Sequence, residues 1–145
     1  MAEETSGTIE IAAPPEEVLE VIADVEAYPE WAGVRSVEVI ERDDLGRPVE
    51  AAFVVDSGGI KANYTLRYDF SGDGSGVSWS STDAGGAIKS VLGGYDLEND
   101  EGTTIATYRM AVETAVPLPG FMKRKAEKRI VETALQGLKR RVEGE

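Results

Sequence analysis

The chain has 145 residues, 41% of them hydrophobic, which suits one domain spanning residues 1–145 that buries roughly two-thirds of its unfolded surface. It contains no Cys and no His, which excludes disulfides, thiolate nucleophiles, imidazole bases and nearly all soft-metal ligation, so we expect no metal and no cofactor. The net charge of −12 argues against nucleic acid as a partner, because phosphate binding needs a dominant positive field.

The start of the chain predicts one strand and two short helical segments. Residues 8–12 alternate between apolar and polar side chains, as a strand does. A helix over 14–25 follows, because its leading prolines suit a first turn and the two glutamates after them favour the positive end of the helix dipole. A second helical turn or tight bend is expected at 26–31, where Pro29 biases Tyr28 away from helical geometry.

From residue 34 onward the chain predicts six strands joined by short turns. Clusters of Gly, Asp and Asn separate the strands, and such short connections mark hairpins, so we expect an antiparallel meander. Gly93-Gly94 within a strand indicates a bulge that would curve the sheet. The predicted strands are 34–41, 49–56, 60–70, 77–82, 87–98 and 103–116.

Alternation along these strands predicts one buried, aromatic face. On the clearest strand, Tyr64, Leu66 and Tyr68 point one way while charged and polar residues point the other. Tyrosine and tryptophan combine an apolar ring with a polar handle, which suits a ligand pocket and also suits an ordinary core. The same parity places further large side chains inside: Phe53, Trp79, Tyr108 and Met110.

Residues 120–143 predict one long amphipathic helix. Its apolar stripe must be buried against the sheet, so we expect a curved sheet that grips the helix and leaves a cavity between them. Gly137, at the edge of the stripe, permits close approach or leaves room. The stripe repeats every four residues at Met122, Ala126, Ile130, Ala134 and Leu138, and is widened by Val131, Leu135 and Val142.

Two features of this helix can each be interpreted in two ways. Glu127 is a candidate catalytic residue that could orient a polar ligand head or act as a general base, although we favour a solvated place near the cavity mouth beside Lys123 and Arg124. Residues 120–145 hold 8 Lys and Arg against 4 Asp and Glu, in contrast with 7 against 23 in residues 1–119. The basic helix indicates contact with an anionic membrane surface or an acidic protein, unless it is a solvated outer face.

Neither a targeting signal nor a membrane-spanning segment is visible. The N-terminal residues lack the basic start and apolar core of a secretory signal, and no stretch approaches the ~20 apolar residues of a membrane span. We therefore expect a soluble, cytoplasmic protein.

The predicted order of one strand, two short helices, six strands and a long C-terminal helix is the helix-grip plan, an α+β fold with a curved, antiparallel, seven-stranded sheet. With this plan the sequence resembles the START-like (SRPBCC) superfamily, which includes bacterial polyketide cyclase/dehydrase-like proteins, coenzyme Q-binding proteins and relatives of plant pollen allergens. The likeness rests on IAAPPEEV at 11–18, DVEAYPEW at 24–31, GYDLE at 94–98 and GTT at 102–104.

This resemblance implies a deep hydrophobic cavity between the sheet and the last helix. It places Trp31 at the entrance, tyrosines that include Tyr95 along the sheet, and apolar residues such as Phe121 on the helix. The predicted ligand-binding residues are Trp31, Phe53, Tyr64, Leu66, Tyr68, Trp79, Tyr95, Tyr108, Met110, Phe121, Met122, Ile130 and Ala134.

Three functions fit these observations. The leading hypothesis is binding or transport of a hydrophobic small molecule, such as a lipid, an isoprenoid quinone or a polyketide-like compound, without catalysis. The second is an enzyme of the cyclase, aromatase or dehydratase type, in which tyrosines polarise a carbonyl while Glu127 or water moves a proton; the lack of His counts against it. The third is a protein-interaction or toxin-like regulatory module that docks through the basic helix.

Overall fold

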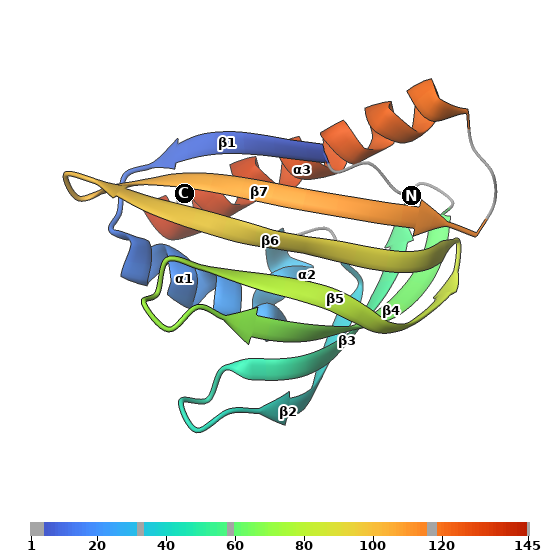
Figure 1. Ribbon diagram of the computed structural model, residues 1–145, viewed down its shortest axis with the longest axis horizontal. Coiled ribbons are helices and arrows are strands. Elements are labelled where there is room, and N and C mark those ends of the chain that lie inside the picture. The colour runs from blue at the N-terminus through green and yellow to red at the C-terminus, as the bar shows by residue number, and fades with distance from the viewer. Residues whose placement is uncertain (1–4, 32–33, 58–59, 116–118, 145) are drawn as a thin grey trace.

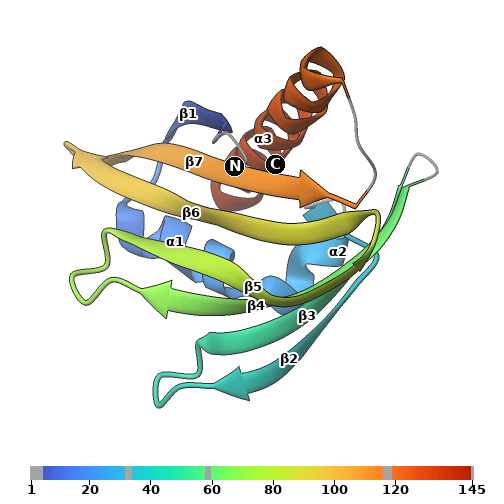
Figure 2. The same cartoon turned by 45° about the vertical axis from the view of Figure 1, so that its right-hand side comes forward.

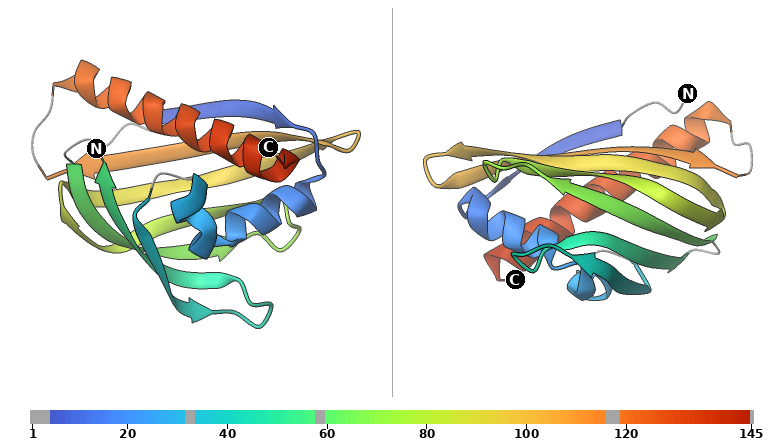
Figure 3. Two further views of the ribbon diagram at one scale, coloured as in Figure 1. Left: turned by 180° about the vertical axis from the view of Figure 1, so that it is seen from behind. Right: turned by 60° about the horizontal axis from the view of Figure 1, so that its bottom comes forward.

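Seven antiparallel strands form one sheet, in the order β1-β7-β6-β5-β4-β3-β2. The computed structural model describes residues 5–31, 34–57, 60–115 and 119–144, and the helices of this part lie on one face of the sheet (Figure 1 and Figure 3). The strands are β1 (Thr5–Ile11), β2 (Ser36–Arg42), β3 (Pro48–Ser57), β4 (Ile60–Phe70), β5 (Gly76–Gly86), β6 (Ile88–Asp100) and β7 (Thr103–Thr114). The helices are α1 (Pro15–Ala23), the 3-10 turn η1 (Val25–Ala27), α2 (Tyr28–Trp31) and α3 (Gly120–Glu143).

The predicted meander is confirmed from β2 to β7, and β1 joins it at the far edge by pairing with β7. Tight turns make this connectivity possible. In the β6–β7 turn, Glu101 and Gly102 both have positive φ angles, 52° and 87°, which a hairpin of this kind requires. Gly46 supplies the left-handed residue of the β2–β3 turn with φ of 80°.

The sequence predicted some boundaries better than others. The strand at 60–70 and the helix at 120–143 have the predicted bounds, whereas β1 begins earlier and β2 later than expected. The strand predicted to end at residue 82 continues to Gly86, because β4 pairs with it as far as Ala62 opposite Gly86. Pairing with a long neighbour thus keeps a Gly-rich segment extended. Val116, the predicted end of the last strand, lies outside the described residues.

The bulge predicted at Gly93-Gly94 is wrong. These glycines keep regular register with both neighbouring strands, and the irregularity of β6 lies between Ile88 and Ser90. Gly93 instead gives room to the aromatic residue opposite it: a Cβ added there would lie 2.8 Å from Trp79 Nε1 and 2.7 Å from the Arg109 carbonyl oxygen. The glycine is needed for close packing rather than for a kink.

The expected bias of Tyr28 away from helix is also wrong. Tyr28 has φ of −56° and ψ of −34°, within the right-handed helical region. Pro29 is tolerated because it falls in the first turn of α2, where the missing N–H has no helical partner to lose. The Tyr28 hydroxyl donates a hydrogen bond to the Ile22 carbonyl, which fixes α2 against α1.

The long helix α3 crosses the face of the sheet and makes its main contacts with β1, β7, α1 and α2 (Figure 3). Val131, Leu135 and Leu138 are buried there, and burying a side chain of this size contributes about 1.5–3 kcal/mol. Two glycines let the elements approach closely. A Cβ on Gly7 would lie 2.8 Å from Val131 Cγ1, and a Cβ on Gly137 would lie 2.8 Å from the Trp31 carbonyl oxygen.

The buried side of α3 differs from the predicted stripe in its first half. Met122, Ala126 and Ile130 are exposed, and the buried residue of this half is Glu127. Each step of four residues passes a full helical turn by about 40°, so a row of such steps drifts around the helix instead of keeping to one face. Figure 2 shows the result: the N-terminal turns of α3 rise clear of the sheet. No helix in the described ranges is long and apolar enough to cross a membrane.

Candidate ligand-binding interior

The aromatic side chains of the inner sheet face form two ring groups. The first contains Tyr28, Trp31, Phe53 and Tyr64. Phe53 of β3 and Tyr64 of β4 are direct cross-strand partners, and their rings stack with centroids 5.4 Å apart. The ring of Tyr28 lies 5.0 Å from that of Trp31 and 6.1 Å from that of Phe53, so α2 is joined to the sheet through aromatic contacts.

The second ring group contains Tyr68, Phe70, Trp79, Tyr95 and Tyr108. Trp79 lies at its centre, within 5.6–5.9 Å of three tyrosine rings. Tyr95 and Tyr108 are cross-strand partners on β6 and β7, and their rings meet edge to face at 4.8 Å. The centroid distances around Trp79 and the edge-to-face contact of Tyr95 with Tyr108 lie within the range that aromatic pairs prefer.

All five tyrosines of the chain belong to these two groups. Burial raises the pKa of Tyr64 to about 12. Burial, and after it the nearness of other tyrosine hydroxyls, also raises the pKa of Tyr28, Tyr68, Tyr95 and Tyr108. The hydroxyls therefore lie near one another and remain protonated at neutral pH, when they can donate hydrogen bonds but cannot act as bases.

Several of these polar groups have no partner within the described ranges. The hydroxyls of Tyr64, Tyr68, Tyr95 and Tyr108 make no hydrogen bond there, in contrast to that of Tyr28, which donates to Ile22. The indole Nε1 of Trp31 is buried and also lacks a partner in this part of the chain. Among the described residues, Trp31 Nε1 is the one fully buried side-chain nitrogen or oxygen atom without a partner. Buried polar groups are usually paired, so a bound acceptor would explain this donor, and the four unpaired hydroxyls could donate to the same molecule.

The structure brings together nine of the thirteen predicted ligand-binding residues. Leu66 and Met110 are buried in the same core as the two ring groups, and Ala134 is half-buried on α3. Phe121, Met122 and Ile130 lie apart from the rings and are largely exposed. Tyr28 was missed, although its position three residues before Trp31 in a helical turn predicts that both rings share one side. The nine residues are Trp31, Phe53, Tyr64, Leu66, Tyr68, Trp79, Tyr95, Tyr108 and Met110.

Glu127 is not the solvated residue that we expected. Only 4% of it is exposed, and it lies where α3 crosses the edge of the sheet. Thr5 Oγ1 donates to Glu127 Oε1 at 3.2 Å, and the Val112 backbone N–H donates to Oε2 at 3.4 Å. Among the described residues the β1–β7 ladder begins with Thr5 opposite Met110. The Glu127 carboxylate accepts from a β7 N–H two residues further along, at Val112.

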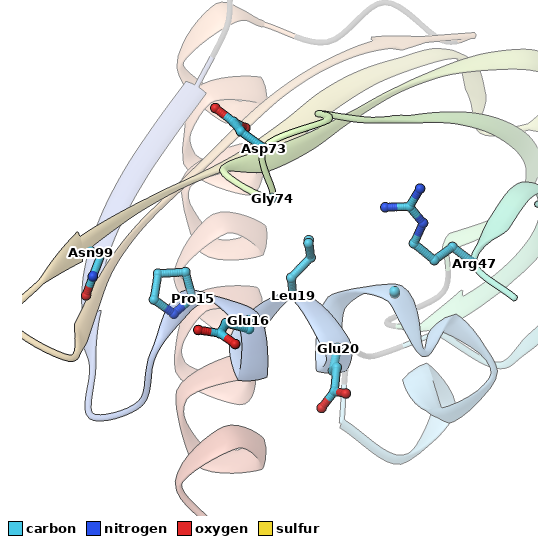
Figure 4. A pocket seen from close by; sticks show the side chains of 9 residues that line it. Pro15, Glu16, Leu19, Glu20, Arg47, Asp73, Gly74 and Asn99 are labelled. Carbon is cyan, nitrogen blue, oxygen red and sulfur yellow. The ribbon is translucent and has the colours of Figure 1, made fainter. Parts of the chain in front are cut away.

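Two clefts among the described residues lie elsewhere on the surface. The larger, of about 510 Å³, separates α1 from the turns at the ends of the strands, and Leu19 points into it while Arg47 reaches in from the opposite side (Figure 4). The Arg47 guanidinium already lies 4.7 Å from the Phe70 ring centroid and pairs with Asp43 at 2.9 Å. The smaller cleft, of about 300 Å³, is lined by β3 and β4 residues beside the ion pair of Arg35 with Asp56. Neither contains a predicted site residue.

The described residues hold no group of three or more acidic side chains arranged to bind a metal ion. Besides the phenol and indole donors of the ring groups, the buried polar side chains of these residues are Thr104 and Glu127.

Comparison with known proteins yields a match to one family model. The model is described as "Polyketide cyclase / dehydrase and lipid transport", and it matches residues 2–143. No curated protein sequence matches the chain.

Several solved structures share the fold. A START superfamily protein from Mycobacterium smegmatis is similar with a TM-score of 0.87 and 22% identity, over 97% of each chain. The Zhui aromatase/cyclase from Streptomyces sp. R1128 has a TM-score of 0.79 and 19% identity, over 99% of this chain and 94% of that one. A STAR-related lipid transfer protein from Xanthomonas axonopodis has a TM-score of 0.74 and 18% identity, over 97% of this chain and 85% of that one. The helix-grip prediction is thereby confirmed.

Proposed function

The chain belongs to the polyketide cyclase/dehydrase and lipid-transport family, and from this premise we propose that it binds or carries an uncharged, oxygen-bearing hydrophobic small molecule in the interior lined by the two ring groups. The observation that carries the proposal is the set of unused donors: four tyrosine hydroxyls and the buried Trp31 Nε1, which have no partner among the described residues. A carbonyl or ether oxygen of a ligand would accept from them.

The charge of the interior favours a neutral ligand. The tyrosine pKa values are raised by burial, by other tyrosines and, for Tyr28, by Asp24. No Lys or Arg of the described residues contributes to these shifts. An anionic ligand would therefore be buried without a counter-ion, which is costly. A quinone or a polyketide-like ring compound meets the requirement better than an ionised fatty acid.

The placement of α3 indicates where on the inner face of the sheet a ligand would lie. Its main contacts with the sheet are on β1 and β7, whereas the tyrosines of the first and second ring groups extend to β4 and β6. A guest lying over those rings would gain about 25 cal/mol for each Å² of apolar surface removed from water, before the costs of binding.

Binding ranks ahead of catalysis because of where Glu127 lies. A cyclase or dehydratase mechanism needs a group that accepts a proton, and each Glu127 carboxylate oxygen is already engaged, one with Thr5 and the other with the backbone of β7. The tyrosine hydroxyls can polarise a carbonyl but hold their own protons at neutral pH, since burial raises their pKa.

The test is native mass spectrometry of protein isolated from cells, followed by calorimetric titration with a defined panel. A prenylated naphthoquinone and a hydroxylated anthraquinone represent neutral ligands, and palmitate represents an anionic aliphatic one. Tyr64→Phe and Tyr108→Phe should each weaken binding of a neutral ligand by about 2–10-fold, the value of one lost hydrogen bond.

Tyr28→Phe is the matched control. It removes the same atom, but from a hydroxyl that already donates to Ile22, so it should lower stability and leave affinity nearly unchanged. Binding of palmitate alone, or no binding of either neutral compound together with no co-purified molecule, would refute the proposal.

A further inference from the structure

We propose that the N-terminal half of α3 docks on an anionic lipid bilayer. The docking segment is residues 121–130 in the N-terminal half of α3, whose first turns rise away from the sheet (Figure 2) and whose contact with the sheet is made through Glu127. The inference is independent of what the interior binds, since it rests on a different surface.

The outward charge of the docking segment is strongly positive. Five of its residues are Lys or Arg: Lys123, Arg124, Lys125, Lys128 and Arg129. Its one acid, Glu127, is turned inward and bound to Thr5 and Val112. Within the described ranges none of the five cations forms an ion pair, whereas Arg141 pairs with Glu30 at 3.3 Å in the second half of the helix. The cations stay unpaired although the whole chain carries a charge of −12.

This placement of cations is unfavourable for the isolated helix. The N-terminus of a helix carries partial positive charge, so acidic residues stabilise its first turn and basic ones destabilise it. The first turn of α3 contains no acidic residue, and its N-cap, Pro119, offers no side-chain hydrogen bond. Lipid phosphates at this end would complement both the cations and the free backbone N–H groups.

Exposed apolar side chains distinguish a bilayer from an acidic protein as the partner. Phe121 is 69% exposed, Met122 48% and Ile130 49%. These three positions span about half of the helix circumference. A groove on a protein partner would contact apolar side chains along one narrow stripe of the helix. A lipid headgroup layer surrounds an inserted helix end and contacts apolar side chains on several sides. Bulky apolar residues beside Lys and Arg are typical of helices that lie in the membrane interface.

The test is co-sedimentation of the full chain with vesicles of phosphatidylcholine alone and of phosphatidylcholine mixed equally with phosphatidylglycerol. We expect binding to the mixed vesicles at low salt, weaker binding at high salt and little binding to neutral vesicles. One cation near an anionic surface is worth about fivefold in affinity, so Lys125→Gln with Arg129→Gln should weaken binding by about 25-fold.

Lys61→Gln with Arg67→Gln is the matched control, because it removes the same charge from exposed positions of β4. It should bind as the unmodified protein does. Phe121→Ser should also weaken binding while leaving the circular dichroism melting curve in place. The proposal is overturned if the mixed vesicles bind no protein at low salt, if the two double variants bind equally, or if soluble polyglutamate binds as tightly as the vesicles.

Discussion

Replacing Gly137 by Ala should destabilise the protein, although alanine is the better helix former. Propensity alone would give a gain of about 1 kcal/mol in the free energy of unfolding. Against it, the new Cβ would lie 2.8 Å from the Trp31 carbonyl oxygen and 3.2 Å from Trp31 Cε3. Overpacking of this kind costs about 1–3 kcal/mol, and contact with a backbone atom, which cannot turn aside, favours the upper part of that range.

The expected net loss is about 1–2 kcal/mol, or about 2–8 °C in melting temperature for a domain of this size. Urea unfolding followed by far-ultraviolet circular dichroism measures it. Gly120→Ala is the matched control in the same helix, because the nearest atom to its Cβ would be the flexible Arg124 Nη1 at 3.4 Å. If Gly137→Ala proves as stable as the unmodified protein, α2 and α3 are not held as closely as described, and the reasoning fails.

Two further changes test the buried polar groups. Glu127→Ala leaves the Thr5 hydroxyl and the Val112 N–H without an acceptor and should lower the free energy of unfolding by about 1–3 kcal/mol. Glu127→Gln keeps an acceptor oxygen and should lower it by less. Equal losses of the two variants in urea unfolding would contradict this role of Glu127. Because burial raises the pKa of every tyrosine, the folded state holds these protons more tightly than the unfolded chain, whose tyrosines titrate near pH ~10. The resulting stability is fully present below that pH and is lost as the pH rises through the folded value, which is about 12 for Tyr64, so a spectrophotometric titration should show tyrosinate appearing late and together with unfolding. A tyrosine that ionises near its ordinary pKa in the folded protein would count against the buried cluster.

Local patterns in the sequence predicted most of the fold. Strict alternation along β4 indicated which side chains face inward, and the turn residues separated the strands of the meander. The same alternation predicted that the aromatic residues of the sheet lie together, because inward-facing residues on paired strands become neighbours.

Contacts between distant elements could not be predicted in this way. A four-residue repeat drifts around a helix, so it does not indicate which side of α3 is buried. That side is set by the close approaches at Gly7 and Gly137, which involve other parts of the chain. Likewise, a glycine inside a strand indicates either a bulge or a close neighbour, and only the register that sets Gly93 opposite Trp79 decides between them. Glu127 looked solvated because its partners, Thr5 and the backbone of β7, are remote in sequence.

The two tryptophans of the chain lie in different ring groups, Trp31 beside Tyr28 and Trp79 among three tyrosines. The protein thus carries two indole fluorophores, each with its own tyrosine donors for excitation transfer. Replacing either indole by phenylalanine would leave a single indole emitter that reports on one side of the interior, so quenching of its fluorescence by a guest would locate that guest without any attached dye.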